Sequence, residues 1–281
     1  MIQPPAADSP APAHPRRRAT AALITALAGL IMALWWLGTP PGLAGKADAI
    51  GYAFCHRIAD RSFHVDGVQL PLCVRCTGMY MGVMIGFLVL VAGRRGKAAH
   101  FAPRRVLIVL AIFVVIMGLD GLNSYLHLFP GYEGPYEPQN WLRLITGSLT
   151  GVAMITLLLP VFSVTIWARP AAQPPLRGLR ELAALLIVIG LADTLVLLGS
   201  APALIVFGYL SALGPVLILT MVFAVLFVSL TRRENTAHRA ADLIVPLLAG
   251  LALTFLLIGG IDLLRHQLTG TWAGFDFSQF G

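Results

Sequence analysis

The stretch LPLCVRCTGMYMGVMIGFLVLVA, residues 70–92, joins a cysteine pair to a long apolar run. From Leu72 to Ala92 it holds roughly the 20 mostly apolar residues that a helix needs to cross a bilayer. Pro71 suits the entry to a helix, because the N–H that proline lacks would have no partner there. The stretch therefore predicts a membrane-spanning helix with Cys73 and Cys76 at its start.

The rest of the chain repeats this apolar pattern. Of the 281 residues, 57% are hydrophobic and 12% are charged, and a typical soluble domain has about 25% charged residues. This composition excludes a soluble globular enzyme, and it also excludes a disordered chain, which needs low hydrophobicity. Further apolar runs lie at 19–37, 106–126, 141–164, 179–198, 204–230 and 241–264. They do not alternate as barrel strands do, so we expect an all-α, polytopic bundle of about seven spans.

The basic residues orient this expected bundle. Cytoplasmic loops carry an excess of lysine and arginine, and a cytoplasmic N-terminus places 14 of the 20 basic residues inside. These are Arg16, Arg17, Arg18, Arg94, Arg95, Lys97, Arg104, Arg105, Arg169, Arg177, Arg180, Arg232, Arg233 and Arg239. The expected topology therefore has a cytoplasmic N-terminus and an extracytoplasmic C-terminus, in a lipid bilayer. The sequence has no basic face with stacking aromatic residues, so it does not predict a nucleic-acid partner.

Three regions follow from this topology. Residues 1–18 are rich in alanine and proline, which predicts a disordered cytoplasmic tail. Residues 19–164 are expected to form a four-helix membrane region with an extracytoplasmic cysteine site. Residues 165–281 are expected to form three further spans and a short extracytoplasmic tail.

All three cysteines, Cys55, Cys73 and Cys76, lie around the outer end of the second expected span. On a helix, the residues three, four and seven positions after Cys73 share its face, and these are Cys76, Thr77 and Tyr80. Glycines at 78, 82 and 86 recur every four residues. This repeat predicts that another helix approaches closely.

The motifs around these cysteines resemble a known family. They are Cys55-His56-Arg57, Arg61-Ser62-Phe63, Gly67 and Leu70-Pro71-x-Cys73-x-Arg75-Cys76-Thr77-Gly78-x-Tyr80-x-Gly82, then Asp120-Gly121, Asn140 and the run Arg143, Gly147 and Gly151. The pattern resembles an uncharacterised family of predicted bacterial and archaeal membrane proteins, domain of unknown function 2085. The resemblance covers roughly residues 50–155. It implies a membrane protein and supports these site residues, but it implies no reaction.

Polar side chains on two further spans converge on the same outer face. Asp120, Asn123, Ser124 and His127 share one face of the third span, and Asn140 and Arg143 open the fourth. Ionisable groups within spans are costly, so they mark a functional site or a structural pair. We expect Arg143 to pair with Asp120. Four guanidinium groups are expected at this outer face, those of Arg57, Arg61, Arg75 and Arg143. They either bind a carboxylate or phosphate ligand or pair with acidic residues outside the membrane.

The cysteines favour a soft-metal site. Cys55, His56, Cys73 and Cys76 provide a Cys3His donor set for zinc, and copper(I) accepts the same donors. His56 adjoins Cys55 in the chain, so His64 or His127 is an alternative fourth ligand. The residues expected to surround the site or to bind a ligand are Arg57, Arg75, Asp120, Asn123, His127, Asn140 and Arg143.

Two other interpretations stay open. A Cys-x-x-Cys pair at a helix N-terminus has a lowered thiol pKa and suits thiol–disulfide redox chemistry, with Cys55 as a third thiol and a quinone or a thiol protein as partner. Alternatively, a disulfide pins the loop in an accessory subunit of a membrane complex. The chain has no glycine-rich phosphate loop, nucleophile elbow, His-Glu-x-x-His motif or Rossmann fingerprint, so its residues specify no reaction.

Overall fold

The computed structural model describes residues 15–129 and 131–274. Its helices are α1 (Pro15–Gly38), α2 (Gly42–Phe54), α3 (Val74–Ala92), α4 (Arg104–Leu126), α5 (Asn140–Ile166), α6 (Leu179–Leu197), α7 (Ala201–Leu230) and α8 (Ile244–Thr269). Short 3-10 turns, η1 (Ala59–Arg61) and η2 (Ala240–Leu243), and two strands, β1 (Ser62–Val65) and β2 (Val68–Cys73), complete the described elements. Most of the tail expected over 1–18 lies outside the described residues, and α1 already begins at Pro15.

The long helices confirm the helical membrane architecture. Within the described ranges, six helices are long and apolar enough to cross a membrane: α1 from Ala19, α3, α4, α5, α7, and α8 together with η2. The remaining expected span, at 179–198, forms α6, but this helix is not among the six. Its 19 residues include Arg180, Glu181 and Asp193, so it carries more charge than a simple apolar span.

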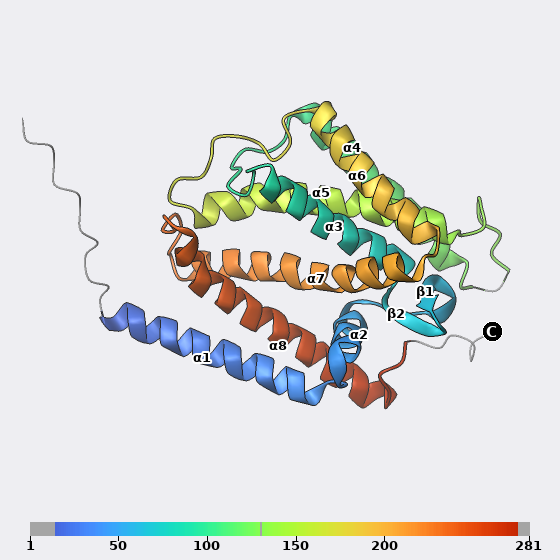
Figure 1. Ribbon diagram of the computed structural model, residues 1–281, viewed down its shortest axis with the longest axis horizontal. Coiled ribbons are helices and arrows are strands. Elements are labelled where there is room, and N and C mark those ends of the chain that lie inside the picture. Colours follow the sequence, from blue (N-terminus) through green and yellow to red (C-terminus); the bar gives the residue numbers. More distant parts are fainter. Residues whose placement is uncertain (1–14, 130, 275–281) are drawn as a thin grey trace, which may run out of the picture.

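The helices run back and forth, so one end of the molecule gathers most of the polar chemistry. In Figure 1 that end holds α2, the two strands, the starts of α3 and α5 and the end of α8. The opposite end holds the turns from α3 to α4, from α5 to α6 and from α7 to α8. Helix α1 lies beside α8 along one edge of the bundle.

A short β-hairpin interrupts the expected all-helical order. β1 and β2 pair antiparallel, with Val65 opposite Val68. The two residues between them, Asp66 and Gly67, have φ angles of 49° and 78°, the left-handed pair that a tight hairpin turn of type I′ requires. Because β2 runs to Cys73, α3 begins at Val74 and not at Leu72 as expected.

Helices α3 and α5 are in backbone contact, which confirms the close approach expected from the glycine repeat. A Cβ atom on Gly78 would lie 2.2 Å from the carbonyl oxygen of Leu144, and one on Gly82 would lie 2.3 Å from that of Ser148. The contact is reciprocal, because a Cβ on Gly151 would lie 2.0 Å from the carbonyl oxygen of Met79. Only glycine permits this spacing.

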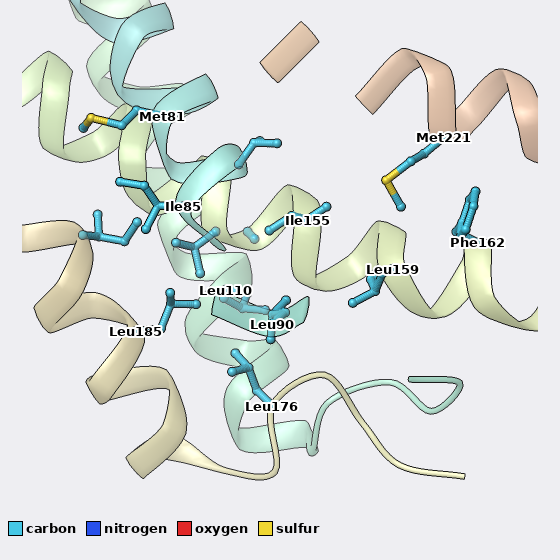
Figure 2. Packing of buried hydrophobic residues seen from close by; sticks show 14 of the residues in the cluster. Met81, Ile85, Leu90, Leu110, Ile155, Leu159, Phe162, Leu176, Leu185 and Met221 are labelled. Atoms are coloured by element: carbon cyan, nitrogen blue, oxygen red, sulfur yellow. The ribbon is translucent and has the colours of Figure 1, made fainter. Parts of the chain in front are cut away.

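Large apolar side chains fill the space beside this glycine contact. Met81, Ile85 and Leu90 from α3 join Ile155 and Leu159 from α5 in one buried cluster (Figure 2). Leu110 of α4 and Leu185 of α6 extend the cluster on the side away from α7. This core holds the first turns of α3 and α5 in a fixed relation, and those turns carry the site residues.

Candidate three-cysteine site

The three cysteines meet at the polar end of the bundle. Cys55 follows α2 directly, Cys73 is the residue before α3, and Cys76 lies in the first turn of α3. Their sulfur atoms all lie within 4.8 Å of one another. Cys55 is buried and the other two are half-buried. All three are free thiols in the structure, so the alternative of a disulfide that pins the loop is not realised here.

Backbone packing brings Cys55 to the other two cysteines, although 18 residues separate it from Cys73. A Cβ on Gly51 of α2 would lie 1.9 Å from the carbonyl oxygen of Pro71 in β2. This glycine therefore lets α2 lie directly on the strand. The backbone N–H of Cys73 donates to the Cys55 sulfur at 3.2 Å, and that of Arg57 donates to it at 3.4 Å.

Charged side chains hold the turn that carries Cys55. Arg57 has φ 53°, a left-handed conformation that is uncommon outside glycine. Its guanidinium forms an ion pair with Asp48 at 2.9 Å, and its carbonyl oxygen accepts a hydrogen bond from Gln69 at 2.9 Å. Arg265 of α8 donates to the carbonyl oxygen of Cys55 at 2.8 Å. Three segments of the chain, α2, β2 and α8, thus fix one short turn.

The thiols are electrostatically unequal. Hydrogen bonds from the Cys55 and Cys76 thiols hold the pKa of the Cys73 thiol well below its usual range, and the Arg75 charge adds to this. Since Cys55 donates to Cys73, the pKa of Cys55 rises to about 11. The arrangement favours one thiolate, on Cys73, flanked by two thiols. A thiolate is the form of cysteine that acts as nucleophile and metal ligand.

The predicted histidine ligands do not join this cluster. His56 is exposed, and it is not one of the three residues whose ligand atoms lie together. His127 instead shares a 2.8 Å hydrogen bond with the carbonyl oxygen of Asn123 and packs edge-on against Tyr132. His64 lies in β1 opposite Gln69. Of the predicted Cys3His donor set, the structure thus brings together the three cysteines but not the histidine.

The predicted ion pair between Arg143 and Asp120 is wrong, because Asp120 pairs with Arg75. The Arg75 guanidinium lies 2.5 Å from the Asp120 carboxylate and donates to Ser124 Oγ at 2.9 Å. Asp120 and Ser124 are one turn apart on α4, so both reach one guanidinium. The rotation of α3 that presents Arg75 to α4 comes from its packing on α5. The spacing of residues along the chain does not predict how α3 is rotated, so it could not predict this pair.

Tyr136 belongs to the same network, and the sequence reasoning missed it. Its hydroxyl donates to the second carboxylate oxygen of Asp120 at 2.8 Å. Its carbonyl oxygen accepts a hydrogen bond from Asn123 at 2.9 Å. Burial, with the hydrogen bond to Asp120, raises the pKa of Tyr136. The loop between α4 and α5 has no regular spacing, so no sequence signal pointed to this residue.

Asn140 and Arg143 lie at the start of α5. Arg143 donates to the Asn140 side-chain oxygen at 2.7 Å. The Asn140 amide in turn donates to the carbonyl oxygen of Asp60 at 3.5 Å, which connects α5 to the turn before β1. Burial, and next the charge of Arg75, lower the pKa of the neighbouring Arg61. Three guanidinium groups, those of Arg61, Arg75 and Arg143, therefore stand near the cysteine cluster.

A helical membrane protein with a cluster of three free cysteines is the class that this fold and site define. A family described as predicted membrane protein (DUF2085) matches residues 55–157, which include all three cysteines. An uncharacterised protein of Methanothermobacter thermautotrophicus is 32% identical over 107 residues, which are 37% of this chain and 82% of that protein. This chain belongs to the DUF2085 family.

A second archaeal relative matches with similar extent. An uncharacterised protein of Methanocaldococcus jannaschii is 29% identical over 122 residues, 43% of this chain and 71% of that protein. No solved structure matches the chain. The family match ends within α5, so α6, α7 and α8 lie outside it.

Proposed function

We propose that Cys55, Cys73 and Cys76 bind a soft metal ion, zinc above all, and that copper(I) is the second choice. The observation that carries this proposal is the mutual approach of the three sulfur atoms to within 4.8 Å. In a tetrahedral zinc site with Zn–S bonds of about 2.3 Å, sulfur atoms lie about 3.8 Å apart. Small rotations of the side chains bridge the difference.

The charges around the cluster suit a metal bound by thiolates. Three thiolates and one divalent cation leave one negative charge, which Arg75 and its neighbours offset. Among the described residues, the cluster contains no fourth histidine, cysteine or carboxylate ligand. Three protein ligands with one open position are the arrangement of catalytic zinc sites, where water or substrate takes the fourth place. His56 at the rim of the site is the alternative fourth ligand.

We place this site on the extracytoplasmic side of a seven-span bundle that includes α6. The support is the distribution of basic residues between the two ends. The connections from α3 to α4, from α5 to α6 and from α7 to α8 lie at the end opposite the cysteines. In or beside them stand exposed arginines, among them Arg94, Arg104, Arg105, Arg169, Arg232 and Arg239. Since cytoplasmic loops carry the excess of basic residues, the cysteine end faces outward.

Elemental analysis of the protein purified without chelator or added metal tests the proposal. We expect close to one zinc per chain, and loss of that zinc in Cys55→Ser and in Cys73→Ser. His56→Ala is the companion variant: retained zinc supports three cysteine ligands with an open position, and lost zinc identifies His56 as the fourth ligand. Protein without zinc or copper, with two of its three thiols oxidised, would contradict a metal site.

The second candidate is thiol–disulfide exchange, which the thiolate character of Cys73 favours. The Cys73 thiolate and a neighbouring thiol would join in a disulfide. Their two electrons and the thiol proton would pass to the disulfide of a partner protein, giving one thiol and one thiolate, or to a quinone, which would take a second proton from water to form the quinol. Cys76→Ser would then accumulate a mixed disulfide with that partner. An accessory subunit would show neither metal nor mixed disulfide, and its cysteine variants would only lose stability.

A further inference from the structure

Arg143 is a buried guanidinium whose charge has no direct counterion among the described residues. Only 7% of the residue is exposed. Its one side-chain hydrogen bond goes to the neutral oxygen of Asn140, and its Nε is buried without a partner among the described residues. No carboxylate in the described chain lies within ion-pair distance of it. A buried charge without compensation is costly, so this position suits an anionic ligand.

The charges next to Arg143 do not supply the missing anion. Its strongest electrostatic neighbours are Arg61 and Arg75, both of the same sign, ahead of Asp120 and Cys73. Asp120 is already engaged by Arg75 and Tyr136. The Arg61 side chain makes no hydrogen bond to a described residue, and the adjacent Asp60 is exposed. Unused guanidinium donors therefore gather beside one another.

The N-terminus of α5 adds backbone donors at the same place. Helix α5 is 27 residues long, and its N-cap residue Gln139 makes no capping hydrogen bond with its side chain. The first N–H groups of a helix have no partner within the helix, and together with the helix dipole they form an anion site. Arg143 lies one turn into this helix, so its guanidinium and those N–H groups can donate to the same anion.

We propose that Arg61, Arg143 and the N-terminus of α5 bind a phosphate group beside the cysteine cluster. Guanidinium groups recognise phosphate through paired hydrogen bonds. A phosphate presents several oxygens in a tetrahedral array, which suits donors that come from two side chains and a helix end. The group comes either from free phosphate or from a phospholipid headgroup, because the site lies at the end of the bundle. This inference goes beyond the proposed metal site and does not depend on it.

Calorimetric titration of the full chain in detergent tests this site with two probes, sodium phosphate and dihexanoylphosphatidylglycerol. We expect Arg143→Gln and Arg61→Gln to weaken the affinity at least about tenfold, because each removes charge-assisted hydrogen bonds. Arg143→Lys keeps the charge but loses the paired donors, and an intermediate affinity is expected. Arg105→Gln is the matched control, since it removes an exposed arginine from the other end of the bundle.

The two probes separate the sources of the phosphate group. Binding of inorganic phosphate supports a site for the free ion, and binding of the phospholipid alone supports a headgroup site. The inference is overturned if neither probe binds, if the arginine variants bind as the wild type does, or if acetate binds as well as phosphate. Zinc content, measured on the same samples, reports separately on the proposed function, because Arg143 is not a metal ligand.

Discussion

The arginines at the two ends of this bundle differ in environment as well as in number. At the cysteine end, Arg57 and Arg143 are each 7% exposed and are held by hydrogen bonds. At the opposite end, Arg104, Arg105 and Arg232 are exposed. Exposed arginines set the orientation of a membrane protein, whereas buried ones need partners and mark a site. Burial therefore distinguishes most arginines of the two ends, and the exception is Arg95 at the opposite end, which is 8% exposed and paired with Glu181.

The ion pairs at the two ends differ in the burial of their carboxylates, whereas the Arg75 and Arg95 side chains are 21% and 10% exposed. Asp120, paired with Arg75, is 2% exposed and accepts a further hydrogen bond from Tyr136. Glu181, paired with Arg95 at the other end, is 38% exposed and lies 3.1 Å from its partner. Desolvation makes the first pair costly to break, and water screens the second.

The largest expected effect comes from removing the buried carboxylate. Asp120→Ala leaves the Arg75 guanidinium without its counterion, and we expect a loss of about 3–5 kcal/mol in the free energy of unfolding. Glu181→Ala, the matched change at the other end, is expected to cost at most about 1 kcal/mol. Denaturant titration in detergent micelles measures both. Equal losses in the two variants would remove the distinction between the two ends.

The next effect concerns the backbone contact that positions α3. Gly78→Ala forces a Cβ to within 2.2 Å of the Leu144 carbonyl oxygen, and overpacking of this kind costs about 1–3 kcal/mol. Gly118→Ala is the matched control in α4, where no atom lies within 4 Å of the added Cβ. That control is expected to be neutral or slightly stabilising, because alanine favours the helix by up to about 1 kcal/mol. Thermal unfolding of both variants checks the contrast.

A smaller effect is expected at the loop between α4 and α5. Tyr136→Phe removes the hydroxyl that donates to Asp120, and the expected loss is about 0.5–1.5 kcal/mol. Tyr132→Phe, in the same loop, deletes a hydroxyl outside this network and keeps the ring contact with His127. We expect no measurable change in its unfolding free energy. A larger loss in Tyr132→Phe than in Tyr136→Phe would show that the network does not stabilise the loop.

The smallest effect on stability is expected at the exposed end. Arg104→Gln combined with Arg105→Gln should change the unfolding free energy by no more than about 0.5 kcal/mol per site. The same double variant should increase the share of chains inserted in the reverse orientation. Protease digestion of a C-terminal reporter on intact cells measures that share. Strong destabilisation would mean that these arginines are structural, as those at the cysteine end are.

Local sequence patterns predict some features of the site and do not predict others. The glycine repeat at 78, 82 and 86 predicted a close helix neighbour, and α5 is that neighbour. Asp66-Gly67 is a strong hairpin signal, and β1 and β2 could have been predicted from it. The Arg75–Asp120 pair depends on how α3 is rotated against α4, which is a property of packing. His56 stands next to Cys55 in the chain, yet Cys55 is buried in the cluster and His56 is exposed outside it.

By itself, the sequence determined the membrane class, the helical architecture and the segment in which the chemistry gathers. Long apolar runs leave few options in a bilayer, because every backbone polar group must be bonded within the structure. Only the tertiary structure decided which thiols meet, which arginine takes Asp120, and which arginine is left without a carboxylate. Those outcomes depend on contacts between α2, β2, α3, α4 and α5. The shape of the packed backbone, and not spacing along the chain, sets them.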